Sequence, residues 1–248
     1  MPIKKGDFVI LNYTCKVRES GETIDTTVKK VAEEAKIAKE GKAAETYEPL
    51  FVVVGEGWVP KGLDEALVGL ETGKTAAIEV PPEKGYGLRD PSKMRLLPLR
   101  KFRAEGVEPL PGMQVQVDGK LASVRSAGAG RVQVDFNHPL AGKTLTYDLS
   151  IEKILESKED KIRALIHKQI PTVSMDKFNL KVQDNELTVE EPEEAFYIEG
   201  VQLAKKEITS NIEKFMPDLE KISFIEIFRK LKPASQVEPE QAVAQKDT

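Results

Sequence analysis

Apolar and polar residues alternate along the first part of the chain, which is the pattern of a half-buried β-strand. In "DFVILNYTCKV" every second residue falls on one face, namely Val9, Leu11, Tyr13, Cys15 and Val17. The turn "ESGE" follows, and "TID" starts a second extended segment. Beyond it the apolar spacing becomes helical and predicts a surface helix that ends near Gly41, with its apolar positions at Val28, Val31, Ala35 and Ala38.

The next apolar segments predict two strands and a short helix. "PLFVVVG" is a buried-type strand, and "TAAIEV" is a strand that ends at Pro81-Pro82, where the ladder loses its donors. Between them, a short helix places three leucines on one side and is expected to stop at Gly73; they are Leu63, Leu67 and Leu70. Together with the first strands, these segments predict a small domain of strands around a short helix over residues 1–91.

Residues 92–137 have a different character, because prolines interrupt their apolar segments and a glycine-rich turn joins two alternating strands. This region is expected to form a small, mostly β module. Strand alternation then resumes over Leu145, Tyr147, Leu149 and Ile151, which would complete the first sheet. The module is therefore predicted to be inserted into a first domain made of residues 1–91 and 138–155.

Residues 156–232 predict a third domain with the order α-β-β-α-β. Ser157 and Asp160 resemble a capping box, and a helical pattern follows at Ile162, Leu165, Ile166 and Gln169. A hairpin is expected about Asp184-Asn185. One long amphipathic helix up to Pro217 would carry Ile198, Val201, Ile208, Ile212 and Phe215. The last strand, "KISFIEIFRKL", is apolar on both faces, and residues 233–248 are expected to be disordered.

Composition narrows the class of protein. The 248 residues are 40% hydrophobic and 31% charged, as in ordinary globular proteins, and the net charge of −4 argues against an extended contact with nucleic acid. No segment approaches the ~20 apolar residues of a membrane helix, and the N-terminus lacks the apolar core of a signal peptide. The single cysteine, Cys15, excludes an internal disulfide. We expect a cytoplasmic protein without nucleic-acid or membrane partners.

Four segments, "YTCKVRESGETIDTT", "VGEGWVPKGLDEALVGLETGK", "VPPEKGYG" and "NHPLAGKTLTYDLSI", resemble the FKBP-type peptidyl-prolyl isomerases in order and character. The resemblance covers residues 4–90 and 137–154 and is greatest to the SlyD-like branch, which carries a domain inserted in the flap. With the extra C-terminal domain, the chain is similar to a long archaeal FKBP. The resemblance implies an α+β fold: an FKBP half-barrel of antiparallel sheet around a short helix, an inserted small β domain and a C-terminal α+β domain.

The resemblance also implies the site residues and their chemistry, which is rotation about X–Pro bonds without a nucleophile, metal or cofactor. The implied catalytic residues are Tyr13, Asp25 and Tyr86. The implied walls of the substrate pocket are Ile24, Leu50, Val59, Pro60, Leu63 and Tyr147. Three positions depart from the common family pattern. Ile24 and Leu63 stand where many members have phenylalanine and tryptophan, and Pro60 lacks the amide N–H that usually donates to the ligand.

The residues taken singly leave other interpretations open. Tyr13, Leu63 and Tyr147 are plausible core residues of any small β domain, and Asp25 is also suited to cap the helix that follows it. His138, in "NHPLAG", is favoured as a structural residue of a turn, in which Asn137 bonds its own backbone and Gly142 adopts positive φ. Substrate contact is the less favoured role of His138.

The inserted module is rich in apolar residues, which form either its core or a groove for unfolded chains, as the SlyD-like resemblance implies. The predicted groove residues are Leu96, Leu97, Leu99, Phe102, Met113, Val132 and Phe136. The sequence therefore predicts a peptidyl-prolyl isomerase with chaperone activity on partly folded clients, and a homodimer formed through the C-terminal domain. The alternatives are a holdase with a relic pocket and, less favoured, a scaffold on a ribosome or other assembly.

Overall fold

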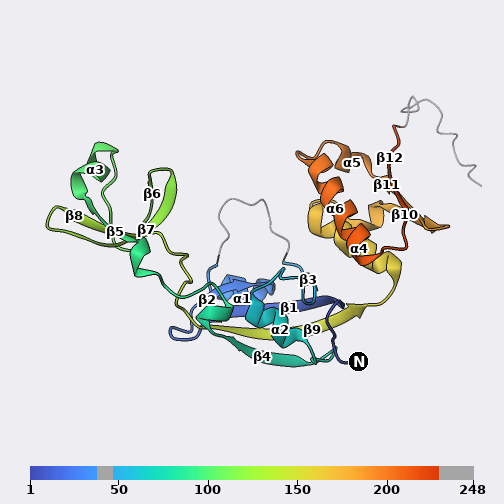
Figure 1. The fold of residues 1–248 in the computed structure, drawn as a ribbon, viewed down its shortest axis with the longest axis horizontal. Helices are drawn as coiled ribbons and strands as arrows, with labels where there is room; N and C mark the ends of the chain where they lie inside the picture. Colours follow the sequence, from blue (N-terminus) through green and yellow to red (C-terminus); the bar gives the residue numbers. More distant parts are fainter. Residues whose placement is uncertain (38–46, 229–248) are drawn as a thin grey trace, which may run out of the picture. The chain divides into compact units, whose positions relative to one another are not determined.

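The computed structural model describes residues 1–37 and 47–228 (Figure 1). It divides into two compact units, Met1–Glu156 and Ser157–Thr248. Strands and helices are both present in each unit, which confirms the mixed α+β class. The predicted disordered tail, residues 233–248, lies outside the described residues.

The first unit contains a five-stranded antiparallel sheet. Its strands are β1 (Phe8–Val17), β2 (Thr23–Thr26), β3 (Leu50–Val53), β4 (Thr75–Val80) and β9 (Leu145–Leu155). The order is β2-β1-β9-β4, and β3 also pairs with β1. Strand β9 returns after the whole of residues 94–135 and pairs with β1 from Val17↔Leu145 to Phe8↔Leu155. The period-two pattern thus predicted both central strands correctly.

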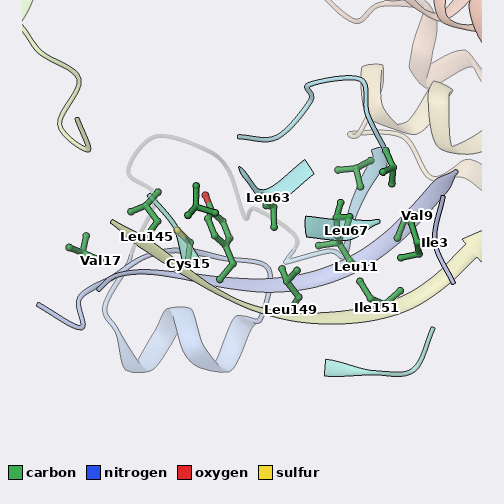
Figure 2. Packing of buried hydrophobic residues seen from close by; sticks show 14 residues of the cluster. Ile3, Val9, Leu11, Cys15, Val17, Leu63, Leu67, Leu145, Leu149 and Ile151 are labelled. Atoms are coloured by element: carbon green, nitrogen blue, oxygen red, sulfur yellow. The ribbon is translucent and has the colours of Figure 1, made fainter. Parts of the chain in front are cut away.

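The core of this unit lies between the sheet and α2 (Lys61–Leu67). Leu63 and Leu67 point from the helix toward Leu11, Leu149 and Ile151 on the sheet (Figure 2). Burial of each such side chain contributes about 1.5–3 kcal/mol to folding. The helix ends at Leu67 instead of continuing to Gly73, because Val68 adopts an extended conformation.

Glycine allows α2 to approach the sheet closely. A Cβ atom at Gly62 would lie 2.8 Å from Cγ1 of Val80, nearer than real side chains approach one another. The surface helix predicted from Val28 is α1 (Lys29–Glu34), which is shorter than the pattern suggested. Its predicted continuation through Ala38 to Gly41 lies outside the described residues.

Residues 94–135 form a separate four-stranded antiparallel sheet. It contains β5 (Met94–Pro98), β6 (Gln114–Val117), β7 (Lys120–Gly128) and β8 (Arg131–Asp135), in the order β5-β8-β7-β6. The short 3₁₀ turns η1 (Pro82–Lys84) and η2 (Pro91–Lys93) precede it. The mostly-β prediction missed one helix, α3 (Leu99–Ala104), which starts after Pro98 and buries Phe102. Pro98 is the N-cap residue, and its φ of −65° suits both the strand before it and the helix after it, so the change from strand to helix is abrupt.

The second unit contains a three-stranded sheet and helices. Its elements are α4 (Lys158–Gln169), η3 (Met175–Lys177), β10 (Asn179–Gln183), β11 (Glu186–Glu191), α5 (Glu193–Phe196), α6 (Val201–Phe215) and β12 (Lys221–Glu226). Strands β10 and β11 form the predicted hairpin, with φ of 47° at Asp184 and 63° at Asn185. The predicted capping box is also confirmed, because the Asp160 N–H donates to Oγ of Ser157 at 3.0 Å.

The prediction of one long helix before Pro217 is wrong. The chain forms the short α5 and then α6, and Gly200 between them has φ +78°. This left-handed conformation is readily available to glycine and breaks the helix. Ile198 consequently lies outside α6, whereas Val201, Ile208 and Ile212 are buried on its inner face. The parallel pairing of β11 with β12 then requires the crossover that α5 and α6 supply.

Candidate active site

A cluster of polar side chains lies where β1, β2 and β9 run side by side. Cys15 of β1 pairs with Asp25 of β2 on one side and with Tyr147 of β9 on the other. Tyr13, two residues earlier on β1, falls on the same face of the sheet. Its hydroxyl donates a hydrogen bond of 2.5 Å to Oδ2 of Asp25, and its ring centroid lies 6.1 Å from that of Tyr147. The sheet register therefore brings these predicted site residues together.

The two phenols on the strands are neutral hydrogen-bonding groups. Burial raises the pKa of Tyr13 well above its ordinary value, and the hydrogen bond to Asp25 raises it further. Burial also raises the pKa of Tyr147, whose hydroxyl is hydrogen-bonded to the Cys15 thiol. The pKa of Cys15 is raised to about 11, mainly by burial. At neutral pH this thiol is protonated and is a poor nucleophile, which agrees with chemistry that needs no covalent step.

Tyr86 lies in the loop after η1, between Gly85 and Gly87. Its side chain is 40% exposed, and its ring stacks on that of His138. Burial raises the pKa of Tyr86, and electrostatic interaction with Cys15 and Asp25 adds to the effect.

Apolar residues surround this cluster. Ile24, Leu50 and Val59 are half-buried and pack against the core of the first unit. The sequence left open that Tyr13, Leu63 and Tyr147 are core residues. Leu63 and Tyr147 are indeed buried members of this core, whereas Tyr13 is only half-buried. Pro60 is the N-cap residue of α2, and its carbonyl accepts the N–H groups of Leu63 and Asp64.

The carboxylates of Asp25 and Asp64 hold main-chain and side-chain groups near these apolar residues. The alternative in which Asp25 caps a helix is wrong, because the N-cap residue of α1 is Val28 and the Asp25 carboxylate accepts from Tyr13 and from the Thr26 N–H. Asp64, which the sequence did not indicate, is buried and accepts the N–H groups of Gly55 at 2.7 Å and Gly57 at 3.0 Å. It thereby fixes the loop that leads to Val59 and Pro60.

The predicted groove of the inserted module is only partly exposed. Leu96 and Met113 are exposed, and Leu97, Leu99 and Phe136 are half-buried around the module's core. Phe102 and Val132 are 2% and 0% exposed and belong to that core. Their assignment to an open groove is therefore wrong, since their side chains already pack against other apolar residues of the module.

A cavity of about 320 Å³ lies against strands β1, β4 and β9 of the five-stranded sheet. Its lining includes Asn12, Thr14, Val28, Thr75, Asp148 and Ser150. Along β1 and β9, these residues alternate with the inward-facing Tyr13, Tyr147 and Leu149. Tyr13 and Leu149 also contribute to the lining, so the cavity borders the tyrosine cluster through Tyr13. Among residues 1–37 and 47–228, no group of three or more His, Cys, Asp or Glu side chains is arranged to hold a metal ion.

Family models match three parts of the chain, the first two of which overlap over residues 95–101. A model described as "FKBP-type peptidyl-prolyl cis-trans isomerase" matches residues 1–101. A model described as "FKBP26, IF domain" matches residues 95–140, and one described as "FKBP26_C-terminal" matches residues 158–229. The first of these matches includes all the tyrosine and aspartate residues of the cluster except Tyr147.

Individual relatives of the chain are also named as peptidyl-prolyl cis-trans isomerases. The chain is 36% identical over 158 residues to a short-type peptidyl-prolyl cis-trans isomerase of Methanocaldococcus jannaschii, covering 64% of this chain and 98% of the relative. It is 27% identical over 163 residues to the FKBP-type isomerase SlyD of Helicobacter pylori, covering 64% and 78%. A 16 kDa FKBP-type isomerase of Escherichia coli K12 is 24% identical over 156 residues, covering 61% and 93%.

Proposed function

The chain belongs to the FKBP-type peptidyl-prolyl cis-trans isomerases, and on this premise we propose that it rotates X–Pro bonds of folding polypeptides at the Tyr13–Asp25–Tyr86 cluster. Ile24, Leu50, Val59, Pro60, Leu63 and Tyr147 form the apolar surroundings of the bound proline. Clients are partly folded chains, and no nucleic acid, membrane or cofactor takes part. We propose a cytoplasmic location, with which the single buried Cys15 is compatible.

The proposed mechanism needs no proton transfer to the substrate. The X–Pro amide resists rotation by ~18–20 kcal/mol because its C–N bond has partial double-bond character. Water stabilises the planar, polar amide more than the twisted one, so an apolar pocket removes that advantage. Lowering the barrier by about 4–5 kcal/mol accelerates rotation roughly a thousandfold. The Tyr86 hydroxyl would hold the substrate carbonyl while the imide turns.

The observation that carries this proposal is the hydrogen bond of 2.5 Å between Tyr13 and Asp25. This bond gives the Tyr13 hydroxyl and the Asp25 carboxylate a hydrogen-bond partner within the protein, so the Tyr13 ring is already oriented before a substrate binds. Burial and this bond raise the Tyr13 pKa, and the ring therefore borders the pocket as a neutral surface. A preorganised, uncharged wall favours the less polar, twisted amide.

A protease-coupled assay on an X-Pro tetrapeptide tests the proposal. We expect the intact protein to accelerate isomerisation, and Asp25→Ala to lower kcat/KM about tenfold or more, because Tyr13 loses its partner. Asp25→Asn retains an acceptor at the same place and is the matched control, with a smaller loss. An intact protein that does not accelerate the reaction would contradict isomerase activity, and an unaffected Asp25→Ala variant would remove Asp25 from the site.

A holdase without isomerase activity is the second candidate function. The observation that favours it is Pro60, which has no N–H to donate to a ligand at the start of α2. A holdase would suppress aggregation of an unfolded client and leave the tetrapeptide reaction at its uncatalysed rate. The tetrapeptide assay therefore separates the two functions.

For residues 92–137 we propose a client-binding role. Leu96 and Met113 are exposed, and Leu97, Leu99 and Phe136 are half-buried against the core of the same small module. Methionine adapts to varied side chains, which suits a site for many unfolded sequences. A client held by this module would present its proline bonds to the isomerase site at a raised local concentration.

For residues 156–232 we propose a dimerisation role. Among the described residues, strand β12 pairs only with β11, and the apolar side chains of Ile225, Ile227 and Phe228 at and just beyond its end are exposed. We expect a dimer mass in light scattering at micromolar concentration, reduced by Ile225→Glu combined with Ile227→Glu. Val182→Glu on β10, the opposite edge, is the matched control. A monomeric mass for the unaltered chain would refute this proposal.

A further inference from the structure

The ring of His138 lies flat against the ring of Tyr86. The two centroids are 4.3 Å apart and the planes differ by 2°. The glycines on both sides of Tyr86 have no side chains that could cover its ring. His138, which follows the inserted module in the sequence, therefore supplies a flat contact that the local sequence of Tyr86 does not.

His138 itself is held firmly by the residues before it. Asn137 is buried, and its Nδ2 group donates to the carbonyl of Asp90 at 2.9 Å, while its Oδ1 accepts the Asp90 N–H at 3.0 Å. The expectation that Asn137 bonds its own backbone is therefore wrong. Its side chain joins the segment that enters the module to the segment that leaves it.

A buried carboxylate strengthens this junction. Asp135 accepts hydrogen bonds from the Asn137 N–H, from Asn137 Nδ2 and from the guanidinium groups of Arg89 and Arg125. Burial alone would raise the pKa of Asp135, but the hydrogen bonds from Asn137 and the charge of Arg125 outweigh it and lower the pKa. The carboxylate is thus charged at neutral pH, and Asn137 is fixed directly before His138.

The residues after His138 complete the connection to the Tyr86 loop. The Leu140 N–H donates to Nδ1 of His138 at 3.2 Å, and the Gly142 N–H donates to the carbonyl of Gly87 at 2.8 Å. The predicted positive φ of Gly142 is confirmed at +75°. The segments of the two stacked rings are thus joined twice, through the Asn137 side chain to the main chain of Asp90 and through the Gly142 N–H to the carbonyl of Gly87.

We propose that His138 is a positioning residue for Tyr86, whose imidazole orders the phenol ring so that its hydroxyl meets the substrate carbonyl. This inference rests on the proposed isomerase function. His138 itself makes no contact with the substrate and acts through the Tyr86 ring. The segment that returns from the inserted module therefore contributes to the isomerase site.

Four variants of the full-length protein test this role in the tetrapeptide assay. His138→Ala is expected to lower kcat/KM about five- to tenfold. His138→Phe keeps a flat ring without the Nδ1 acceptor and should retain most of the activity, whereas His138→Asn keeps an acceptor without the ring and should resemble His138→Ala. In a Tyr86→Phe background, which lacks the hydroxyl, His138→Ala should cause no further loss.

Three outcomes would overturn the proposal. The first is a His138→Ala variant whose kcat/KM is within twofold of that of the unaltered protein. The second is an active His138→Asn variant together with an inactive His138→Phe variant. The third is that His138→Ala lowers kcat/KM by the same factor in the Tyr86→Phe background as in the unaltered protein. The third outcome would indicate direct contact of His138 with substrate. NMR of the Tyr86 ring supplies a readout that does not need activity, since His138→Ala should shift its resonances and His138→Phe should keep them in a stacked environment. If the unaltered protein is inactive, the proposed function fails, and unchanged Tyr86 resonances in His138→Ala would still overturn the positioning role.

Discussion

A chain that lacks residues 92–136 is expected to isomerise a tetrapeptide at nearly the rate of the intact protein, but to accelerate the refolding of a proline-limited protein about a hundredfold less. The tetrapeptide reaches the Tyr13–Asp25 cluster by diffusion, so it does not need a holding module. A refolding client needs such a module, because its X–Pro bonds are few and are accessible only transiently.

The structure indicates how to make this deletion. Asp135 is lost with the module, but Asp90 and Asn137 remain joined by two hydrogen bonds that do not involve it. The ends left by the deletion are therefore adjacent, and a short glycine linker can connect them. The two rates are measured on the same preparation, which makes the tetrapeptide rate the control for folding of the remaining domain. An equal loss on both substrates would contradict a client-binding role for the module.

A double substitution on the surface of the module tests client binding while the fold of the module is kept. Leu96→Ser with Met113→Ser removes two exposed apolar side chains and leaves the buried core of the module, including Phe102 and Val132, unchanged. We expect this variant to reproduce part of the deletion's effect on the refolding protein. Leu121→Ser, at another exposed position of the same module, is the matched control and should leave the refolding rate unchanged.

The elements that the sequence predicted well are those whose side chains alternate with a regular period over many residues. Strands β1 and β9 each keep one face buried along ten or eleven residues, so the presence and extent of these strands follow from the pattern. Helix α3 was missed because its six residues are too short to show a period between two prolines. The break at Gly200 was missed because apolar residues continue at helical spacing on both sides of it.

The site was predictable only in part, for a different physical reason. The cluster of Tyr13, Asp25 and Tyr147 depends on which residues of three strands lie opposite one another, and the family resemblance supplied that register. Asp64 and Asn137 hold their loops through hydrogen bonds to main-chain groups distant in the sequence. A single sequence gives no period or spacing from which such contacts follow.

In the second unit, Lys205→Met is expected to lower the free energy of unfolding by about 3–5 kcal/mol at pH 7. Lys205 of α6 is almost completely buried, and its Nζ lies 2.8 Å from Oε2 of Glu191 and 2.8 Å from Oε1 of Glu226. Glu191 has a fully buried side chain. Removing the lysine therefore leaves a carboxylate without its cation in an apolar interior.

The size of this effect should depend on pH. Burial raises the pKa of Glu191, and the charge of Lys205 opposes that rise. A carboxyl group with a raised pKa in the folded state stabilises the fold fully only below its ordinary pKa, and that contribution is lost as pH rises through the raised value. Because Lys205→Met raises the Glu191 pKa further, the variant should lose little stability near pH 4 and much more at pH 7.

Urea unfolding at pH 4 and at pH 7 measures the loss of stability of the variant. Hydrogen-exchange protection of peptides that cover β11 and α6 reports the stability of this unit in particular. Combining Lys205→Met with Glu191→Gln should restore part of the loss, because no buried charge then remains at Glu191. Lys221→Met is the matched control, since the Lys221–Glu186 pair in the same sheet is exposed and removing it should have little effect. If Lys205→Met behaves like Lys221→Met, or if its loss is the same at both pH values, the buried carboxylate does not govern the stability of this unit.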